Sequence, residues 1–161
     1  MIICFSERII PTLKSRFDPA DIKFEVKIAH SKPEIFNLAH SLDYSKYSAL
    51  VACGGDRTYH ELVNGMLLRG DGARLPVALI PTGSNNGHCK SIGITGVQEA
   101  LQHILDGRVS RFDVMKVTRD GYEENNYTSH RYSISSIIQG FPCDLIKNAT
   151  YLHMLKYKLF D

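Results

Sequence analysis

The sequence lacks the features that mark secreted, membrane-spanning or nucleic-acid-binding proteins. Its 161 residues contain four cysteines but no C-x-x-C pair, and no apolar run approaches the roughly 18 residues of a membrane span. The opening MIICFSERII has no basic leader and too short an apolar run for a signal peptide. Lysines and arginines are spread along the chain without a basic stripe, and the net charge is only +2. We therefore expect no transmembrane segment, no signal peptide and no nucleic-acid partner.

The positions of the four cysteines in the sequence indicate a reducing cellular compartment. Cys4, Cys53, Cys89 and Cys143 lie far apart in the sequence, and free cysteine is commonly buried as a thiol. Buried free thiols suit a reducing environment, so we expect a soluble cytoplasmic protein. A hydrophobic share of 43% at this length gives room for about one ordinary domain with a packed core.

Strand and helix patterns alternate along the first two thirds of the chain. Apolar runs predict strands at residues 22–29, 47–53, 76–80 and 111–117. Apolar residues at helical spacing predict helices at residues 7–17, 33–42, 58–69 and 97–105, the second of them capped by Ser31. This order predicts an α/β fold, a Rossmann-like layered sheet with helices on both faces and right-handed crossovers.

The pattern changes near Asp120. The polar segment DGYEENN predicts a turn, and the stretch behind it, YTSHRYSISSIIQGF, is rich in β-forming residues with no helix in between. We therefore expect residues 1–118 to form the α/β domain. Residues 119–161 are expected to begin a second, antiparallel β domain that stays incomplete.

Two glycine-bearing loops each follow a predicted buried strand. Residues 54–56 read Gly-Gly-Asp, and residues 83–87 read Gly-Ser-Asn-Asn-Gly. In an open α/β sheet, ligands bind beyond the carboxyl ends of the strands, so neighbouring strands would bring the two loops to one edge. Glycines let backbone N–H groups approach phosphate oxygens, and the helix that follows the first loop offers its positive N-terminus. The joint placement predicts a phosphate-binding site.

The polar side chains of these loops suit phosphate chemistry. Thr58 and Ser84 supply hydroxyl donors. Asp56 supplies a carboxylate that could orient an attacking hydroxyl or hold Mg²⁺. An equally simple role for Asp56 is that of a turn residue whose side chain caps a helix.

The stretch GGDRTYHELVNGML, followed by LIPTGSNNG, resembles the catalytic domain of the diacylglycerol kinase superfamily, with the sphingosine kinase and ceramide kinase branch nearest. The residues that match the family pattern are Gly54, Gly55, Asp56, Glu61, Asn64, Gly65, Pro81, Gly83, Ser84 and Asn86. Farther along, SIIQGFPCD resembles the branch's entry into its second, lipid-binding domain. There an acidic residue recognises the lipid head group, and Asp144 stands at that position.

The resemblance implies a lipid kinase that transfers the γ-phosphoryl group of ATP to a lipid hydroxyl at a membrane surface, with Mg²⁺ required. Asp56 would be the general base or the carboxylate on the metal side, and Asp144 would bind the substrate. Glu61 and Asn64 would fix the loop and the helix. The residues expected around the nucleotide are Gly54, Gly55, Arg57, Thr58, Gly83, Ser84, Asn85 and Asn86.

The sequence also departs from the family pattern. Arg57 and Asn85 replace glycines, and Ala29 stands where many relatives carry threonine. An arginine forced into the left-handed region would cost about 1–2 kcal/mol, whereas Asn85 would enter that region more easily. The Arg57 guanidinium could occupy the phosphate cleft or pair with a phosphate. The family's first strand is expected to be missing, and the second domain to be cut short.

Two alternatives therefore stay open beside the lipid kinase. One is a catalytically inactive or regulatory remnant that keeps the α/β fold. The other is a nicotinamide nucleotide kinase, because that family shares a Gly-Gly-Asp-Gly motif.

Overall fold

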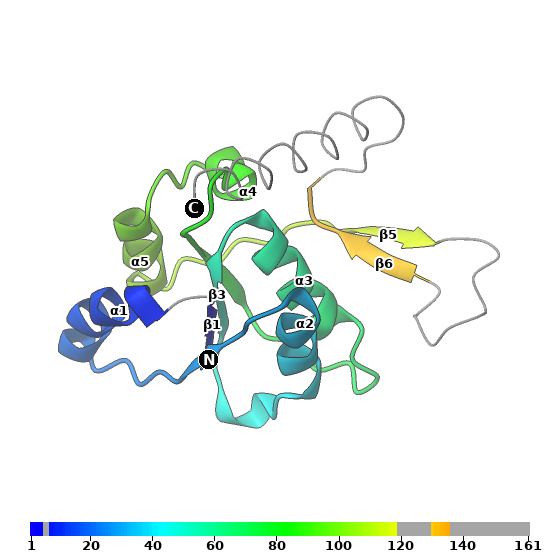
Figure 1. Ribbon diagram of the computed structural model, residues 1–161, viewed down its shortest axis with the longest axis horizontal. Helices are drawn as coiled ribbons and strands as arrows, with labels where there is room; N and C mark the ends of the chain where they lie inside the picture. The colour runs from blue at the N-terminus through cyan, green and yellow to red at the C-terminus, as the bar shows by residue number, and fades with distance from the viewer. Residues whose placement is uncertain (5–6, 119–129, 136–161) are drawn as a thin grey trace, which may run out of the picture.

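A four-stranded parallel sheet forms the centre of the protein (Figure 1). The computed structural model describes residues 1–4, 7–118 and 130–135. The sheet has the strand order β2-β1-β3-β4, and every neighbouring pair is parallel. Its strands are β1 (Ile2–Cys4), β2 (Val26–Ile28), β3 (Leu50–Gly54) and β4 (Val77–Pro81). The predicted α/β architecture is confirmed.

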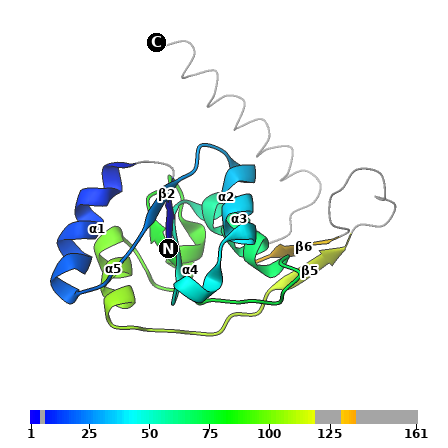
Figure 2. The same cartoon turned by 90° about the horizontal axis from the view of Figure 1, so that it is seen from below.

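Helices cover both faces of this sheet (Figures 1 and 2). One face carries α1 (Ile10–Phe17) and α5 (Val97–Leu105), and the other carries α2 (Lys32–Ser41) and α3 (Asp56–Leu67). The shorter helices are η1 (Glu7–Ile9), η2 (Asp18–Ala20), η3 (Tyr44–Lys46) and α4 (Gly87–Ser91). Successive strand residues point to opposite faces, so β3 places Val51 in the α1 and α5 core and Ala52 in the α2 and α3 core.

Most predicted helices are found close to their expected positions. The Ser31 hydroxyl accepts a hydrogen bond from the Glu34 backbone N–H at 3.3 Å, which confirms it as the N-cap of α2. Helix α5 matches the predicted residues 97–105, and α3 begins at Asp56, two residues earlier than expected. Helix α4 was not predicted.

The expectation that the first strand is missing was wrong. Ile2–Cys4 forms β1, which pairs with β2 on one side and with β3 on the other. The strand is only three residues long and buried on both faces, so it shows no alternation that a sequence pattern could detect. Strand β2 is also shorter than the predicted residues 22–29.

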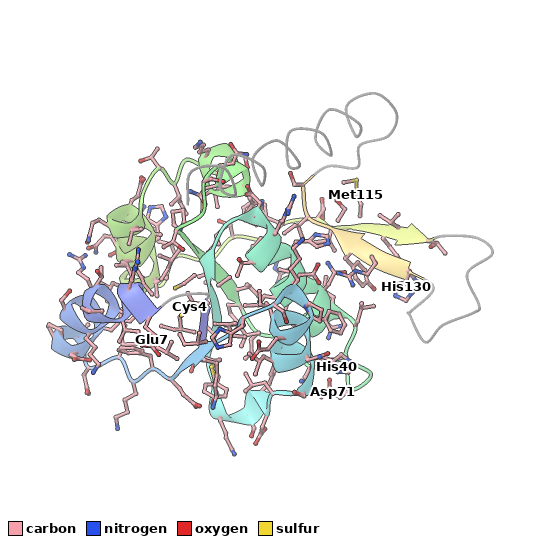
Figure 3. The ribbon with its side chains drawn as sticks, in the orientation of Figure 1. Cys4, Glu7, His40, Asp71, Met115 and His130 are labelled. Carbon is pink, nitrogen blue, oxygen red and sulfur yellow. The ribbon has the colours of Figure 1, made fainter. Side chains whose placement is uncertain are left out.

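The predicted hairpin is present but begins inside the segment assigned to the first sheet. Strand β5 (Met115–Thr118) pairs antiparallel with β6 (His130–Ser133) and does not join the parallel sheet. Figure 3 shows Met115 and His130 on this small sheet, which lies beside α3 and away from Cys4. The rest of the expected second domain, with Cys143 and Asp144, lies outside the described residues. The domain boundary at residue 118 stays a prediction.

The predicted burial of the cysteines is confirmed for the three that lie among the described residues. Cys4, Cys53 and Cys89 are all buried, and among the described residues none of them forms a disulfide. In the described part of the chain, every helix is too short or too polar to cross a bilayer.

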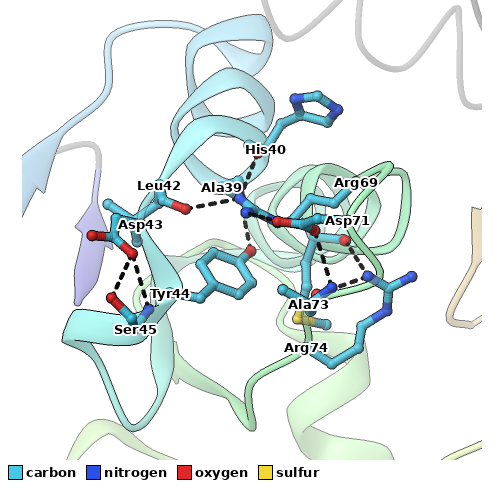
Figure 4. Close-up of polar contacts among 11 residues, drawn as sticks. Ala39, His40, Leu42, Asp43, Tyr44, Ser45, Arg69, Asp71, Ala73 and Arg74 are labelled. Atoms are coloured by element: carbon cyan, nitrogen blue, oxygen red, sulfur yellow. Dashed lines mark hydrogen bonds and ion pairs between the residues drawn. The ribbon is translucent and has the colours of Figure 1, made fainter.

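Helices α2 and α3 pack closely and are tied together at their C-terminal ends. Arg69 follows α3 and donates hydrogen bonds to the carbonyls of His40 at 2.6 Å and Leu42 at 2.8 Å (Figure 4). Its guanidinium also pairs with Asp71 and lies 4.1 Å from the centre of the Tyr44 ring. These contacts fix the end of α3 opposite the Gly-Gly-Asp loop.

The closest approach of the two helices predicts a specific sensitivity at Gly65. A Cβ atom there would lie 2.4 Å from the Phe36 carbonyl oxygen, so Gly65→Ala must push α2 and α3 apart. We expect a loss of about 1–3 kcal/mol in the free energy of unfolding, measured by urea denaturation. Gly70→Ala is the matched control, because a Cβ at this exposed position meets nothing within 4 Å. Equal stability of the two variants would contradict the inferred packing.

Candidate phosphate-binding site

The two glycine-bearing loops meet at the carboxyl edge of the sheet, as predicted. Strands β3 and β4 are neighbours, with Gly54 opposite Pro81. Beyond that pair, the backbone N–H groups of Thr82 and Gly83 both donate to the Gly54 carbonyl, at 3.0 and 3.2 Å. The loops therefore form one continuous backbone surface.

Glycine is required where the loops touch. A Cβ atom on Gly83 would lie 2.4 Å from the Gly55 Cα and 2.8 Å from the Gly55 nitrogen. Any side chain there would force the loops apart, so Gly55 and Gly83 allow a backbone-to-backbone contact.

Gly54 and Thr58 form a second close contact in the first loop. A Cβ atom on Gly54 would lie 2.2 Å from Thr58 Oγ1. Thr58 is only 3% exposed, so its hydroxyl lies under the loop. The predicted contact between Thr58 and the nucleotide stays untested, and the visible role of this side chain is packing.

Asp56 joins the first loop to the helix that follows the second. Its Oδ2 accepts a hydrogen bond from the Gly87 backbone N–H at 2.9 Å, and its Oδ1 accepts one from the His88 N–H at 2.8 Å. The carboxylate thus caps the N-terminus of α4 while belonging to the first turn of α3. The capping role anticipated for Asp56 is present, but on a different helix from its own.

Asn86 closes the second loop. Its side-chain Oδ1 accepts from the Gly83 N–H at 3.0 Å, and its Nδ2 donates to the Gly83 carbonyl at 2.6 Å. Asn86 has φ 54° and ψ 42°, whereas Asn85 has no positive φ and is exposed. The left-handed conformation, which Asn85 was expected to tolerate, is instead adopted by Asn86 with the support of its own side chain.

The N-terminus of α3 faces this joined loop. Its N-cap is Gly55, which has no side chain to bond the first N–H groups. The Thr58 N–H donates to the Gly55 carbonyl at 3.0 Å, whereas the Asp56 and Arg57 N–H groups precede the first intrahelical bond. Arg57 lies in the first turn, does not have a positive φ, and is exposed. The backbone cost that a left-handed arginine would carry does not arise.

An aromatic stack lies beside Asp56. The His88 ring stacks on Tyr59 with 4.7 Å between ring centres, and it meets the Phe112 ring edge-on at 6.0 Å. Burial lowers the pKa of His88, although the Asp56 charge acts in the opposite direction. The lowered pKa favours the neutral imidazole at pH 7.

The structure thus gathers nearly all the predicted site residues. Those brought to one edge of the sheet are Gly54, Gly55, Asp56, Arg57, Thr58, Gly83, Ser84, Asn85 and Asn86. Ser84 and Asn85 are exposed on the second loop, while Asp144 lies outside the described residues. The contribution of Gly87 and His88 was missed because no local pattern shows that their N–H groups meet a carboxylate 31 and 32 residues earlier.

This arrangement defines an α/β protein with two glycine-bearing loops at adjacent strand ends, the place where ligands bind in open α/β sheets. Residues 5–117 match the diacylglycerol kinase catalytic domain. The match covers well over half of the chain, and the protein therefore belongs to the diacylglycerol kinase catalytic domain family.

Named relatives support this assignment. The chain is 33% identical over 124 residues to sphingoid long chain base kinase 4 of Schizosaccharomyces pombe, a stretch covering 73% of this chain and 27% of that protein. It is 28% identical over 141 residues to sphingosine kinase 1 of Arabidopsis thaliana, covering 83% and 28%. With human ceramide kinase the identity is 24% over 161 residues, covering 90% and 29%. The aligned stretches span less than a third of each relative.

Among solved structures, an NAD kinase from Archaeoglobus fulgidus in complex with ATP aligns with a TM-score of 0.42 and 13% sequence identity. The alignment covers 70% of this chain and 39% of that one. This likeness is too low to support a function.

The bonds of Asp56 predict that its charge holds the loops together. In Asp56→Asn, the amide nitrogen would face a backbone N–H that now donates to a carboxylate oxygen. We expect a loss of about 1–3 kcal/mol in unfolding free energy, measured by urea denaturation. Asp113→Asn, at an exposed position, is the matched control and should change stability by less than about 0.5 kcal/mol. An unchanged stability of Asp56→Asn would contradict the bridging role.

Proposed function

We propose that this chain is the ATP-binding catalytic part of a lipid kinase that phosphorylates the hydroxyl of a sphingoid base, ceramide or diacylglycerol. The observation that carries the proposal is the fused pair of loops, with Asp56 bonded across them and the uncapped N-terminus of α3 beside them. The names of the relatives, which are sphingosine and ceramide kinases, favour a sphingolipid acceptor.

The residues at this edge fit a nucleoside triphosphate. Gly55, the N-cap of α3, has no side chain to cover the first N–H groups of the helix, and these groups favour an anion. Exposed Ser84 and Asn85 add side-chain hydrogen-bonding groups on the second loop.

Mg²⁺ also fits this site, although through few protein ligands. Within the described residues, no group of three or more His, Cys, Asp or Glu side chains is assembled for a metal. Magnesium in kinases is usually held by one or two carboxylates together with substrate phosphates, so Asp56 and bound ATP would suffice. The metal would supply neutralisation of the phosphate charge.

Asp56 keeps enough capacity for a role in the reaction. Each carboxylate oxygen has two lone pairs, and each accepts one hydrogen bond from α4. A second pair on either oxygen could accept the proton of the attacking lipid hydroxyl as its oxygen bonds to the γ-phosphorus and the bond to the leaving ADP oxygen breaks. Alternatively, the same pair could bind Mg²⁺.

The acceptor side of the reaction is also part of the proposal. We assign Asp144 to the lipid head group, and we place the working protein in the cytoplasm, bound peripherally at a membrane surface that supplies the lipid. An inactive remnant is the second candidate, and the observation that favours it is the replacement of the family glycine by Arg57 at the start of α3.

The proposal is tested first by nucleotide binding and phosphoryl transfer. Mg-ATP at millimolar concentration should raise the melting temperature, since a ligand that binds only the folded state stabilises it. The chain should also transfer labelled phosphate from ATP to sphingosine, ceramide or diacylglycerol in mixed micelles. Ser84→Ala should weaken ATP binding about threefold to tenfold by removing one hydrogen bond. Ser48→Ala, which precedes β3 at the opposite edge of the sheet, should leave binding unchanged.

No thermal shift with Mg-ATP would overturn nucleotide binding by this chain. A shift without transfer to any of the three lipids would favour the inactive remnant.

Arg57 decides between the two candidates most directly. Because its backbone is unstrained and its side chain is exposed, we expect the guanidinium to pair with a phosphate. Arg57→Gly should then weaken Mg-ATP binding about tenfold, and Arg57→Lys should keep part of the affinity, as measured by titration calorimetry. A gain in affinity for Arg57→Gly would show instead that the arginine obstructs the site.

A further inference from the structure

Asn64, on the third turn of α3, pairs with the backbone of β6. Its Oδ1 accepts a hydrogen bond from the Tyr132 N–H at 2.8 Å, and its Nδ2 donates to the Tyr132 carbonyl at 2.9 Å. A side-chain amide thus bonds both backbone groups of one residue, as a neighbouring strand would. Asn64 is 0% exposed, so these bonds are shielded from water.

Glu61, one turn earlier on the same helix, makes a second contact with β6. Its Oε2 lies 2.7 Å from Nη2 of Arg131, and the two side chains are 18% and 41% exposed. The Arg131 guanidinium also lies 5.5 Å from the centre of the Phe36 ring in α2. Strand β6 is therefore held by polar contacts to both helices on this face of the parallel sheet.

The contacts of the small sheet with helix α3 are polar. Neither apolar cluster formed by the described residues includes a side chain of β5 or β6. The pairs Asn64–Tyr132 and Glu61–Arg131, here called the α3–β6 clamp, bond β6 to α3. A buried, bonded polar pair favours one geometry, because a slip of the strand would remove the donor to Asn64 Oδ1, while Nδ2 would keep its bond to the His60 carbonyl at 3.0 Å.

Helix α3 connects this clamp to the phosphate-binding loops. Asp56 lies in its first turn and Asn64 eight residues later, about 12 Å along the helix axis. The far end of the helix is fixed by Arg69, and Gly65 holds it against α2. Because α3 is constrained in this way, it acts as a rigid body, and the position of the loops determines the position of β6.

We infer that Glu61 and Asn64 are positioning residues, which fix the β5–β6 sheet relative to the bound nucleotide. The inference rests on the proposed function for the identity of the two substrates, ATP at the loops and a lipid as the phosphoryl acceptor. Neither residue touches ATP. Loss of the clamp lowers the efficiency of transfer to the lipid while nucleotide affinity is retained.

The first arm of the test measures the clamp itself. In Asn64→Asp, a carboxylate oxygen replaces the amide donor to the Tyr132 carbonyl. Amide hydrogen exchange at β6 should then accelerate about tenfold, the effect of losing one buried hydrogen bond. Arg131→Gln weakens the clamp from the β6 side without changing α3, and serves if Asn64→Asp does not fold. Unchanged exchange in both variants would overturn the clamp.

The second arm separates positioning from a merely structural role. In Arg131→Gln, the KM for the lipid should rise severalfold while the Kd for Mg-ATP changes less than about twofold. The charge reversal Glu61→Arg with Arg131→Glu should restore the lipid KM, and each single reversal should not. A normal lipid KM in the folded Arg131→Gln variant would overturn the positioning role.

The two arms also separate this inference from the kinase proposal. If the unmodified chain phosphorylates no lipid, the kinase proposal fails, and the exchange measurement still decides whether the clamp holds β6.

Discussion

The backbone contact between Gly55 and Gly83 is the constraint on which the rest of the site depends. Parallel strands β3 and β4 end side by side, but the loops that follow them can come into contact only if neither has a side chain at the point of contact. The contact sets the Gly54 carbonyl to accept two N–H groups of the second loop, and it brings Asp56 within reach of α4. A side chain at Gly83 would undo all of these bonds together.

Helix α3 extends the effect of that contact across the molecule. Its first turn belongs to the loops, and its third turn both holds β6 through Asn64 and packs against α2 through Gly65. The residues that resemble the family motif are therefore not a list of nucleotide ligands. Within the first stretch, residues 54–65, only the start lies at the loops, and the later residues join the helix to its neighbours, as was expected in outline for Glu61 and Asn64.

The sequence predicted what depends on local patterns. Strand and helix order, the Ser31 cap, and the meeting of two loops at one edge follow from periodicity, capping chemistry and parallel-sheet geometry. It could not predict contacts between distant segments, such as those of Asp56 with α4 and of Asn64 with β6. Strand β1 was missed because its three residues are all buried and show no alternation of polar and apolar side chains. The left-handed conformation of Asn86 was missed because it depends on hydrogen bonds to Gly83.

The departures from the family pattern differ in their effects on backbone conformation and charge. Asn85 causes no backbone strain, because the left-handed conformation is adopted by Asn86 and the side chain of Asn85 is exposed. Arg57 likewise leaves the backbone intact, since the first turn of α3 accepts any side chain in helical conformation. What Arg57 changes is charge. A guanidinium at the positive end of a helix is disfavoured unless an anion lies between them. A bound phosphate would be such an anion, so the substitution that departs most from the pattern is compatible with the ligand the loops are proposed to bind.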